Sequence, residues 1–317
     1  MTKSLKLKGI DKMVEVDYIS PVVADALAHL PHPTDVALRI IAEFNLTPII
    51  AIEKEFYIKR EGILVEKNSI DLKAVSEILA RETLFERITP ESGEGQFEIS
   101  TNPTSDVIGL METVFRIMYI LDQFVSYSKL HIDGRSKPIS EQPGNGIHVH
   151  LTLNNDEGCN VLKKDSGTER SESLLMLHVV AGLLHTLPDL MVAFAPTSMC
   201  YQRYIEPPFP NMFFSPTRIS WGADNRSAAI RIPPSTVQPE ARRIEHRVAG
   251  GSASIKYIIS AILIGTYYGL KRACFPQFSK TYGLPSNPIL GLPKLPNCFD
   301  LALNSFMKKG ICLWKEL

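Results

Sequence analysis

Apolar residues recur at helical spacing along five segments of this chain. The longest segment, 105–129, places Val107, Leu110 and Val114 three or four residues apart, and the segment Thr104-Ser105-Asp106 before them can supply a cap. An apolar stripe of this kind has to be buried, so each segment is predicted to be a helix that packs on a core. The predicted helices cover residues 33–44, 71–84, 105–129, 171–187 and 252–270.

Short segments rich in β-branched and aromatic residues lie between these helices and predict strands. Their expected bounds are 48–58, 95–100, 146–153, 227–232 and 243–249. Proline-rich loops are expected at 206–216 and 275–296, and no linker divides the chain into independent halves. Strands separated by long helices, some as hairpin-like neighbours, indicate an α+β domain.

The composition is that of a soluble globular protein, with 44% hydrophobic residues and 34 basic residues balancing 34 acidic ones. This balance gives no reason to expect nucleic acid or an anionic membrane as a partner. The longest apolar run, 257–270, is too short to span a bilayer, and the N-terminus lacks the apolar stretch of a secretory signal. The five cysteines form no CxxC pair, so we expect reduced thiols and a cytoplasmic protein.

Arginine replaces lysine in the second half of the chain. No lysine lies between Lys164 and Lys256, whereas arginines recur at 170, 203, 218, 226, 231, 242, 243 and 247. The planar fork of arginine suits carboxylate and phosphate, so these residues are either anion-binding or a chance set of surface charges.

Charged and imidazole side chains occupy alternate positions on the predicted strands. Side chains of a strand alternate between its faces, so Glu53 and Glu55 project together and repel each other unless a cation lies between them. One such pair alone is more often a solvated surface. The pattern recurs, however, with further groups on or beside three other strands: Glu91, Glu94 and Glu98; His148 and His150; and Arg243, Glu245 and Arg247. Four such strands favour one shared site.

The residue types of this set indicate a kind of chemistry. Carboxylates with one or two imidazoles, and no cysteine, suit Mg²⁺ or Mn²⁺ better than zinc. Carboxylate-bound metals beside arginines are typical of phosphoryl transfer. The chain contains no GxxxxGK[ST] loop, dinucleotide fingerprint or GxSxG elbow, so the predicted site is built on a sheet.

These segments, in this order, resemble the glutamine synthetase family. AIEKEF is similar to the family's first metal-binding strand, EGQFEIS to its glycine-glutamine-aromatic-glutamate signature, and QPGNGIHVHLTL to its histidine strand. WGADNRSAAIRIP and ARRIEHR are similar to its arginine strands. The likeness extends over about residues 33–270. It implies a curved antiparallel sheet backed by helices, as in the catalytic domains of glutamine synthetases and guanidino kinases.

The resemblance also implies roles for individual residues. The metal ion beside the acceptor carboxylate would be bound by Glu55, Glu91 and Glu98, and the metal ion at the ATP phosphates by Glu53, His148 and Glu245. The residues implied to contact ATP or the transferred phosphoryl group are His150, Arg226, Arg231 and Arg243. The implied glutamate site consists of Arg203, Arg247 and Gly144.

The implied reaction is ATP-dependent formation of an amide between the γ-carboxylate of glutamate and ammonia or another amine, through an acyl phosphate. Two to three Mg²⁺ or Mn²⁺ ions would be the cofactors, and ATP a co-substrate. Two alternatives stay open: a non-catalytic or regulatory relative that binds nucleotide and metal, and a guanidino-kinase-like enzyme, which the motif order does not favour.

The sequence departs from the family pattern in three places. Residues 1–32 are too few for the family's N-terminal β-grasp domain, so a catalytic domain over 33–317 is expected without it. The register of the family's site-closing glutamate falls on Phe209, which leaves Glu206 as the candidate catalytic replacement. The C-terminal end is short as well, so a homo-oligomer remains an option but the family's ring assembly is not expected.

Overall fold

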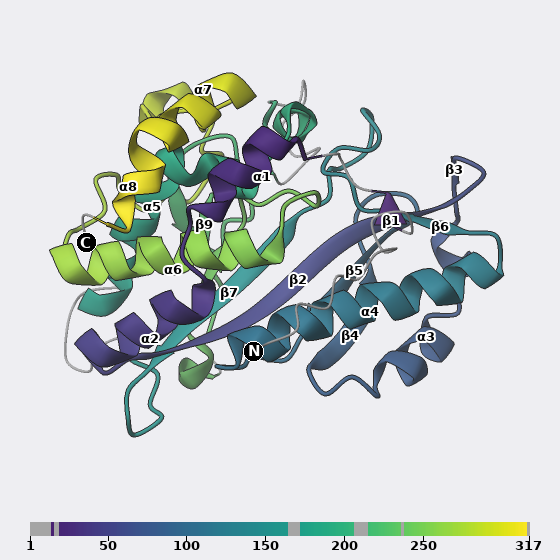
Figure 1. Ribbon diagram of the computed structural model, residues 1–317, viewed down its shortest axis with the longest axis horizontal. Coiled ribbons are helices and arrows are strands. Elements are labelled where there is room, and N and C mark those ends of the chain that lie inside the picture. Colours follow the sequence, from purple (N-terminus) through teal and green to yellow (C-terminus); the bar gives the residue numbers. More distant parts are fainter. Residues whose placement is uncertain (1–13, 16–18, 164–171, 206–214, 236–237, 316–317) are drawn as a thin grey trace.

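A fourteen-residue strand, β2 (Thr47–Arg60), lies at the centre of a ten-stranded sheet (Figure 1). The computed structural model describes residues 14–15, 19–163, 172–205, 215–235 and 238–315. Along the main path the strand order is β1-β6-β2-β7-β10-β9-β8, while β5 pairs with β2 and β4. The other strands are β1 (Val14–Glu15), β3 (Ile63–Leu64), β4 (Phe85–Pro90), β5 (Gln96–Thr101), β6 (His131–Asp133), β7 (Ile147–Asn154), β8 (Trp221–Ala223), β9 (Ile230–Ile232) and β10 (Ile244–His246).

The strands that carry the predicted site pair antiparallel. β2 lies between β5 and β7, and β7 pairs with β10, so the four predicted polar strands are consecutive neighbours. The expected mixed α+β fold with a curved, mainly antiparallel sheet is confirmed; β1–β6 and β8–β9 are parallel pairs.

Helices cover the apolar side of this sheet. The helices are α1 (Pro21–Ala28), α2 (Pro33–Phe44), α3 (Leu72–Leu79), α4 (Val107–Tyr127), α5 (Leu174–Phe194), α6 (Ile255–Arg272), α7 (Phe299–Ser305) and α8 (Ile311–Leu313), of which α7 packs on α5 and not on the sheet. In Figure 1, α2 and α6 lie on one side of the long diagonal of β2, and α3 and α4 on the other. Ile50, Ile52 and Phe56 of β2 project into this core and are fully buried. The opposite face of β2 is thereby left for the glutamates.

Several predicted elements differ from the observed ones at their ends, among them β10, which ends at His246 and not at the predicted residue 249. α5 continues to Phe194 although Pro188, which has no N–H to donate, lies inside it. β9 begins only at Ile230, because Asn225 Oδ1 accepts the Ser227 N–H at 3.0 Å and forms a turn where a strand was predicted. α3 ends at Leu79, short of the predicted residue 84.

Several further elements were not predicted, among them α1 and β4. α1 buries Val23, Ala26 and Leu27 in the main core. β4 was missed because FERITP mixes charged and apolar residues without clear alternation.

α5 is the one helix of the described chain that is long and apolar enough to cross a membrane. In the fold, 67% of its apolar window is buried, and it packs against α6 and α7. Its composition is therefore accounted for by its place in the core.

Candidate functional site

The site is built from rows of side chains that face one another across the sheet. In the register, Glu53 of β2 lies opposite His148 of β7 on one side and Ser100 of β5 on the other. The next row pairs Glu55 with Glu98. Directly opposite residues project from the same face, so strands far apart in sequence place their polar groups together.

One group of carboxylates gathers around the second row. Carboxylate oxygens of Glu55, Glu91 and Glu98 lie within 4.8 Å of one another. Glu91 reaches this group from the turn between β4 and β5, and the backbone N–H of Gly146 donates to Glu55 Oε2 at 2.5 Å. The three residues predicted from the resemblance to share a metal ion are thus neighbours in space.

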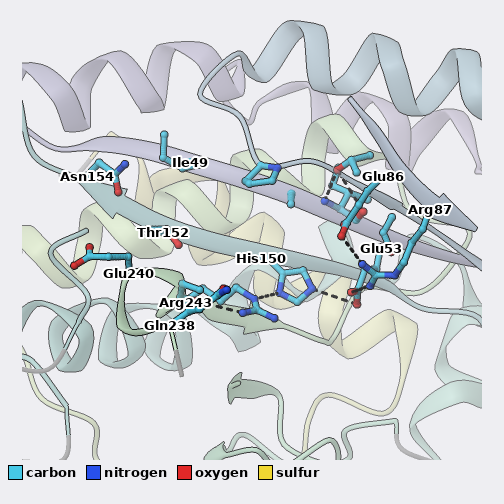
Figure 2. A pocket seen from close by; sticks show the side chains of 16 residues that line it. Ile49, Glu53, Glu86, Arg87, His150, Thr152, Asn154, Gln238, Glu240 and Arg243 are labelled. Carbon is cyan, nitrogen blue, oxygen red and sulfur yellow. Dashed lines mark hydrogen bonds and ion pairs between the residues drawn. The ribbon is translucent and has the colours of Figure 1, made fainter. Parts of the chain in front are cut away.

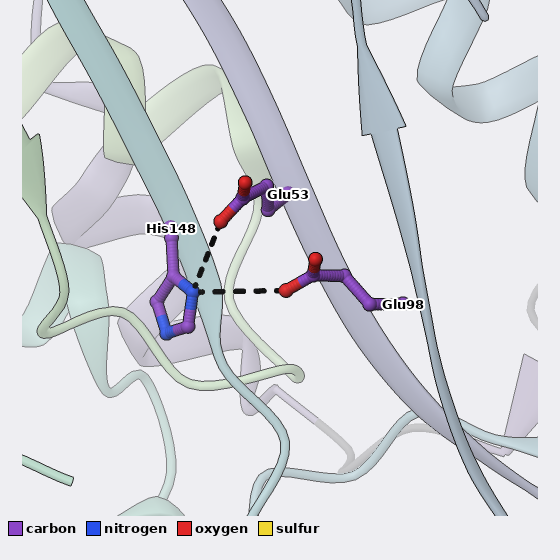
Figure 3. A group of neighbouring side chains, drawn as sticks. All are labelled: Glu53, Glu98 and His148. Carbon is purple, nitrogen blue, oxygen red and sulfur yellow. Dashed lines mark ion pairs between the residues drawn. The ribbon is translucent and has the colours of Figure 1, made fainter. Parts of the chain in front are cut away.

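A second group centres on His148 (Figure 3). Its Nδ1 lies 3.6 Å from Glu53 Oε2, 4.0 Å from Glu98 Oε2 and 3.9 Å from Glu245 Oε1. This nitrogen is buried and has no hydrogen-bond partner among the described residues. His150 of the same strand approaches Glu53 Oε2 at 3.2 Å, and Glu53, His150 and Glu245 form another set with ligand atoms within 4.8 Å.

The proton affinities of these groups are perturbed in opposite directions. Burial, together with the nearby charges of Glu53, Glu55 and Glu91, raises the pKa of Glu98 to about 9. Burial acts in the same direction on Glu245, but Arg247 and the histidines outweigh it and lower its pKa to about 2. The site therefore holds carboxylates that lack enough positive charge around them.

These observations fit a divalent metal ion. Oxygen ligands with one imidazole match the preference of Mg²⁺ and Mn²⁺, and a cation would offset the mutual repulsion of the carboxylates. It would also give the His148 Nδ1 atom a partner. The residues placed to hold such ions are Glu53, Glu55, Glu91, Glu98, His148, His150 and Glu245.

The larger of two cavities beside these groups has a volume of about 500 Å³ (Figure 2). It lies on the Glu53 side, and its wall includes His150 and Arg243, whose Nε donates to His150 Nδ1 at 3.1 Å. Two charged residues of β4, Glu86 and Arg87, complete one end. This volume is in the range of small-molecule sites.

The smaller cavity, of about 70 Å³, lies on the Glu55 side. Its wall brings together all three residues of the implied glutamate site, Arg203, Arg247 and Gly144. A Cβ atom at Gly144 would lie 3.0 Å from Arg203 Cγ, so glycine permits this close approach. The Arg203 Nε is buried without a hydrogen-bond partner among the described residues.

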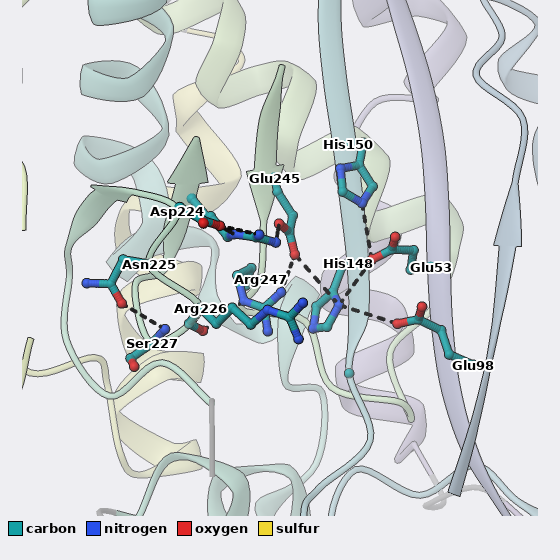
Figure 4. A network of polar contacts seen from close by, with 12 residues as sticks. Glu53, Glu98, His148, His150, Asp224, Asn225, Arg226, Ser227, Glu245 and Arg247 are labelled. Carbon is teal, nitrogen blue, oxygen red and sulfur yellow. Dashed lines mark hydrogen bonds and ion pairs between the residues drawn. The ribbon is translucent and has the colours of Figure 1, made fainter. Parts of the chain in front are cut away.

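The other predicted arginines lie toward Glu245 (Figure 4). Arg231 Nη1 donates to Glu245 Oε2 at 2.7 Å, and its Nη2 pairs with Asp224. Arg226 lines the smaller cavity and, with Arg231, a separate open one next to Asp224. Neither Arg226 nor Arg231 lines the larger cavity, unlike Arg243. Glu206 lies outside the described residues.

Comparison with known proteins agrees with this geometry. The model of the glutamine synthetase catalytic domain matches residues 66–315, most of the chain. The chain belongs to the glutamine synthetase catalytic-domain family. This confirms the predicted resemblance.

Two synthetases are among the relatives of this glutamine synthetase-like chain. It is 29% identical over 254 residues to gamma-glutamylputrescine synthetase PuuA of Escherichia coli, covering 71% of this chain and 52% of PuuA. It is 29% identical over 304 residues to glutamine synthetase of Pyrococcus abyssi, covering 88% of this chain and 66% of that enzyme. The chain thus spans between half and two thirds of the length of these relatives.

Solved structures share the fold. A GmaS/ADP complex superposes with a TM-score of 0.72 at 19% identity, covering 90% of this chain and 68% of that one. A glutamine synthase homologue superposes with a TM-score of 0.72 at 22% identity, covering 90% of this chain and 66% of that one.

Sequence reasoning missed the contributions of β4 and β5. Glu86, Arg87 and Ser100 line the larger cavity, but none was predicted to be a site residue, although Ser100 ends the EGQFEIS motif. Ser100 could have been found, because it lies at i+2 from Glu98 on a predicted strand. Arg87 could not, since the strand that carries it was not predicted.

Proposed function

We propose that this protein is an ATP-dependent ligase that forms an amide between the γ-carboxylate of glutamate and ammonia or another amine. One observation carries the proposal: two cavities flank a single cluster of candidate metal ligands, one lined by His150 and Arg243 and the other by Arg203 and Arg247. A nucleotide in the larger cavity and an amino acid in the smaller one would bring phosphate and carboxylate together at the ligands.

The residues of the smaller cavity suit a dicarboxylic amino acid. Arg203 is 5% exposed, and its Nη1 donates to the Val248 carbonyl at 2.8 Å, which fixes the guanidinium. Its unpartnered Nε is then available to a carboxylate oxygen. Arg247 is held by Glu245 and by the Arg226 carbonyl, so both guanidinium groups are ordered before a substrate enters.

The chemistry has two steps. The γ-carboxylate of glutamate attacks the terminal phosphorus of ATP, ADP leaves, and an acyl phosphate forms. The amine then attacks the acyl carbon, phosphate leaves, and the amine loses a proton. The arginines would orient both anions and compensate their charge. Bound Mg²⁺ or Mn²⁺ would clamp and neutralise the phosphoryl oxygens.

The ligand set supports the bound cation that the ligase requires. Keeping this many buried carboxylates close together costs stability unless a cation is bound, and each predicted ligand position carries a competent side chain. The gamma-glutamylputrescine synthetase and glutamine synthetase among the relatives suggest putrescine and ammonia as the first amines to test.

The test is phosphate release from ATP with Mg²⁺ or Mn²⁺, glutamate and one amine at a time from ammonia, methylamine, ethanolamine and putrescine. We expect release with one preferred amine, and a loss of about a hundredfold or more in Glu98→Gln, because electrostatic stabilisation of charge at the reacting groups is lost. Glu94→Gln is the matched control, because Glu94 is exposed in the turn just before the strand that carries Glu98.

Two results would count against the ligase. ATP binding without release for any amine of the panel would favour the non-catalytic alternative. Formation of ADP without phosphate release, dependent on a guanidino compound and not on glutamate, would favour the kinase-like one.

A further inference from the structure

Arg87 of β4 projects toward the candidate metal ligands from a strand with no predicted role. Its Nη2 lies 3.3 Å from Glu53 Oε1, and its Nη1 lies 2.6 Å from Glu86 Oε1. The side chain is 45% exposed and lines the larger cavity together with His150 and Arg243 (Figure 2). Nitrogen-bearing side chains of β4, of β7 and of the residue just before β10 therefore converge on one cavity.

A β-bulge gives Arg87 this direction. From Arg87 to Pro90 the register of β4 with β5 is regular, but it shifts between Phe85 and Arg87. In an unbroken strand these two residues would share a face. The bulge instead lets Phe85 join the core while Arg87 lies opposite Ser100, which lies opposite Glu53. Arg87, Ser100, Glu53 and His148 thus form one row on the site face.

Ser100 gives independent evidence of a missing ligand. It is 1% exposed, lines the cavity, and its Oγ has no hydrogen-bond partner among the described residues. A buried hydroxyl without a partner is uncommon in a native structure. A ligand oxygen between Ser100 and Arg87 would satisfy it.

We infer that Arg87 binds a phosphate group of the nucleotide in the larger cavity, with the Ser100 hydroxyl beside it. The inference rests on the proposed function, which places ATP there. The Arg87–Glu53 pair is partly exposed, so separating it costs little. When Glu53 turns to a metal ion, Arg87 loses that partner, and its planar fork matches phosphate oxygens. The residue would then bind the ligand on which the reaction takes place.

The test is the dissociation constant of ADP, measured by calorimetry with Mg²⁺ on the whole chain. Adenosine serves as the probe without phosphate. We expect Arg87→Gln to weaken ADP binding about tenfold or more, as for loss of a charged hydrogen bond, and to leave adenosine binding unchanged. Arg87→Lys keeps the positive charge but loses the planar guanidinium. Its dissociation constant for ADP should lie between those of wild type and Arg87→Gln.

Arg116→Gln is the matched control, because Arg116 also pairs with a glutamate, Glu82, but lies on α4 outside the cavity. The unfolding temperature of each variant is recorded beside its affinity. If Arg87→Gln binds ADP within twofold of the wild-type affinity, the inference is wrong but the proposed function is unaffected. The same holds if the variant loses affinity equally for ADP and for adenosine. Failure of the wild-type chain to bind ADP overturns the proposed function, and the inference with it.

Discussion

The side chain of Glu98 is surrounded by three other carboxylates and is 7% exposed. Its pKa of about 9 in the folded chain lies far above the value of about 4.3 for an exposed glutamate. Between these two values the folded chain binds more protons than the unfolded chain, so the contribution of Glu98 to stability falls as pH rises through the window. Glu98 is therefore a local source of instability that a cation would remove.

Glu98→Gln should raise the thermal stability of the metal-free chain at pH 8. The glutamine amide cannot ionise, whereas the Glu98 carboxyl group tends to lose its proton as the pH rises. Each 1 kcal/mol gained in the free energy of unfolding raises the unfolding midpoint temperature by about 2–4 °C. Thermal unfolding in EDTA at pH 5 and pH 8 measures this, with the difference between variant and wild type larger at pH 8. If the variant is no more stable than wild type at pH 8, the crowded carboxylates do not destabilise the metal-free chain, and the prediction is wrong.

Single residues were predictable from the sequence where the strand pattern was regular. Glu53 and Glu55 share a face, as their spacing predicted, and both lie at the candidate site. Arg87 was not predictable, because a bulge changes which residues share a face and leaves no mark in the alternation.

At the scale of elements, the closest packing lies between α5 and α6. A Cβ atom on Gly182 of α5 would clash with the backbone of Gly265 and Gly269 of α6. Glycine at these positions lets the two helices approach until their backbones touch. Both helices line the apolar side of the sheet, so their separation affects how the core fits beneath the site.

Gly182→Ala should lower the free energy of unfolding by about 1–3 kcal/mol, since the added methyl group forces the helices apart. Gly283→Ala is the control, because a Cβ atom there would meet nothing within 4 Å. Urea denaturation of both variants gives the comparison. Equal stabilities would mean that α5 and α6 separate at no cost.

The central helices and strands were predicted because their apolar pattern is long and regular. Residues 33–44 form α2 with the predicted bounds, and β2, β5 and β7 each lie within two residues of theirs. The ends of α3 and β9 were less predictable, since they depend on turns and on side-chain hydrogen bonds such as that of Asn225.

At the scale of the whole molecule, a buried ion cluster ties the sheet to the loop that leads into β7. Asp133 is fully buried and accepts from Lys59 of β2 at 2.5 Å and from Arg135 Nη2 at 2.6 Å. Burial alone would raise the pKa of Asp133, but the hydrogen bonds from Arg135 and Lys59 outweigh it and hold the pKa below its ordinary value. The backbone carbonyls of Asp133 and Arg135 also accept from Asn145, next to Gly144 and Gly146.

Asp133→Asn should destabilise the fold by about 3 kcal/mol at pH 7, because two cations lose their buried partner. Because the pKa of Asp133 is lower in the folded chain than in the unfolded chain, its ionised form stabilises the fold at pH values above the unfolded pKa of about 3.9. This stabilisation is lost as the pH falls through the folded pKa. The difference in free energy of unfolding between wild type and Asp133→Asn should therefore be constant from pH 7 to pH 5 and become smaller below about pH 4. Urea unfolding at several pH values measures it, and a gap that widens in acid would contradict the assignment.

The row that joins Arg87, Ser100, Glu53 and His148 has a consequence for how the protein folds. Its members come from four strands, and Glu245, which completes the ligand set, lies nearly two hundred residues after Glu53. Contacts so distant in sequence form slowly, because long loops must close first. No local hairpin can assemble the full ligand set. The moment during refolding at which the chain first binds Mn²⁺ with high affinity would therefore report when the strands that carry the ligands have all paired.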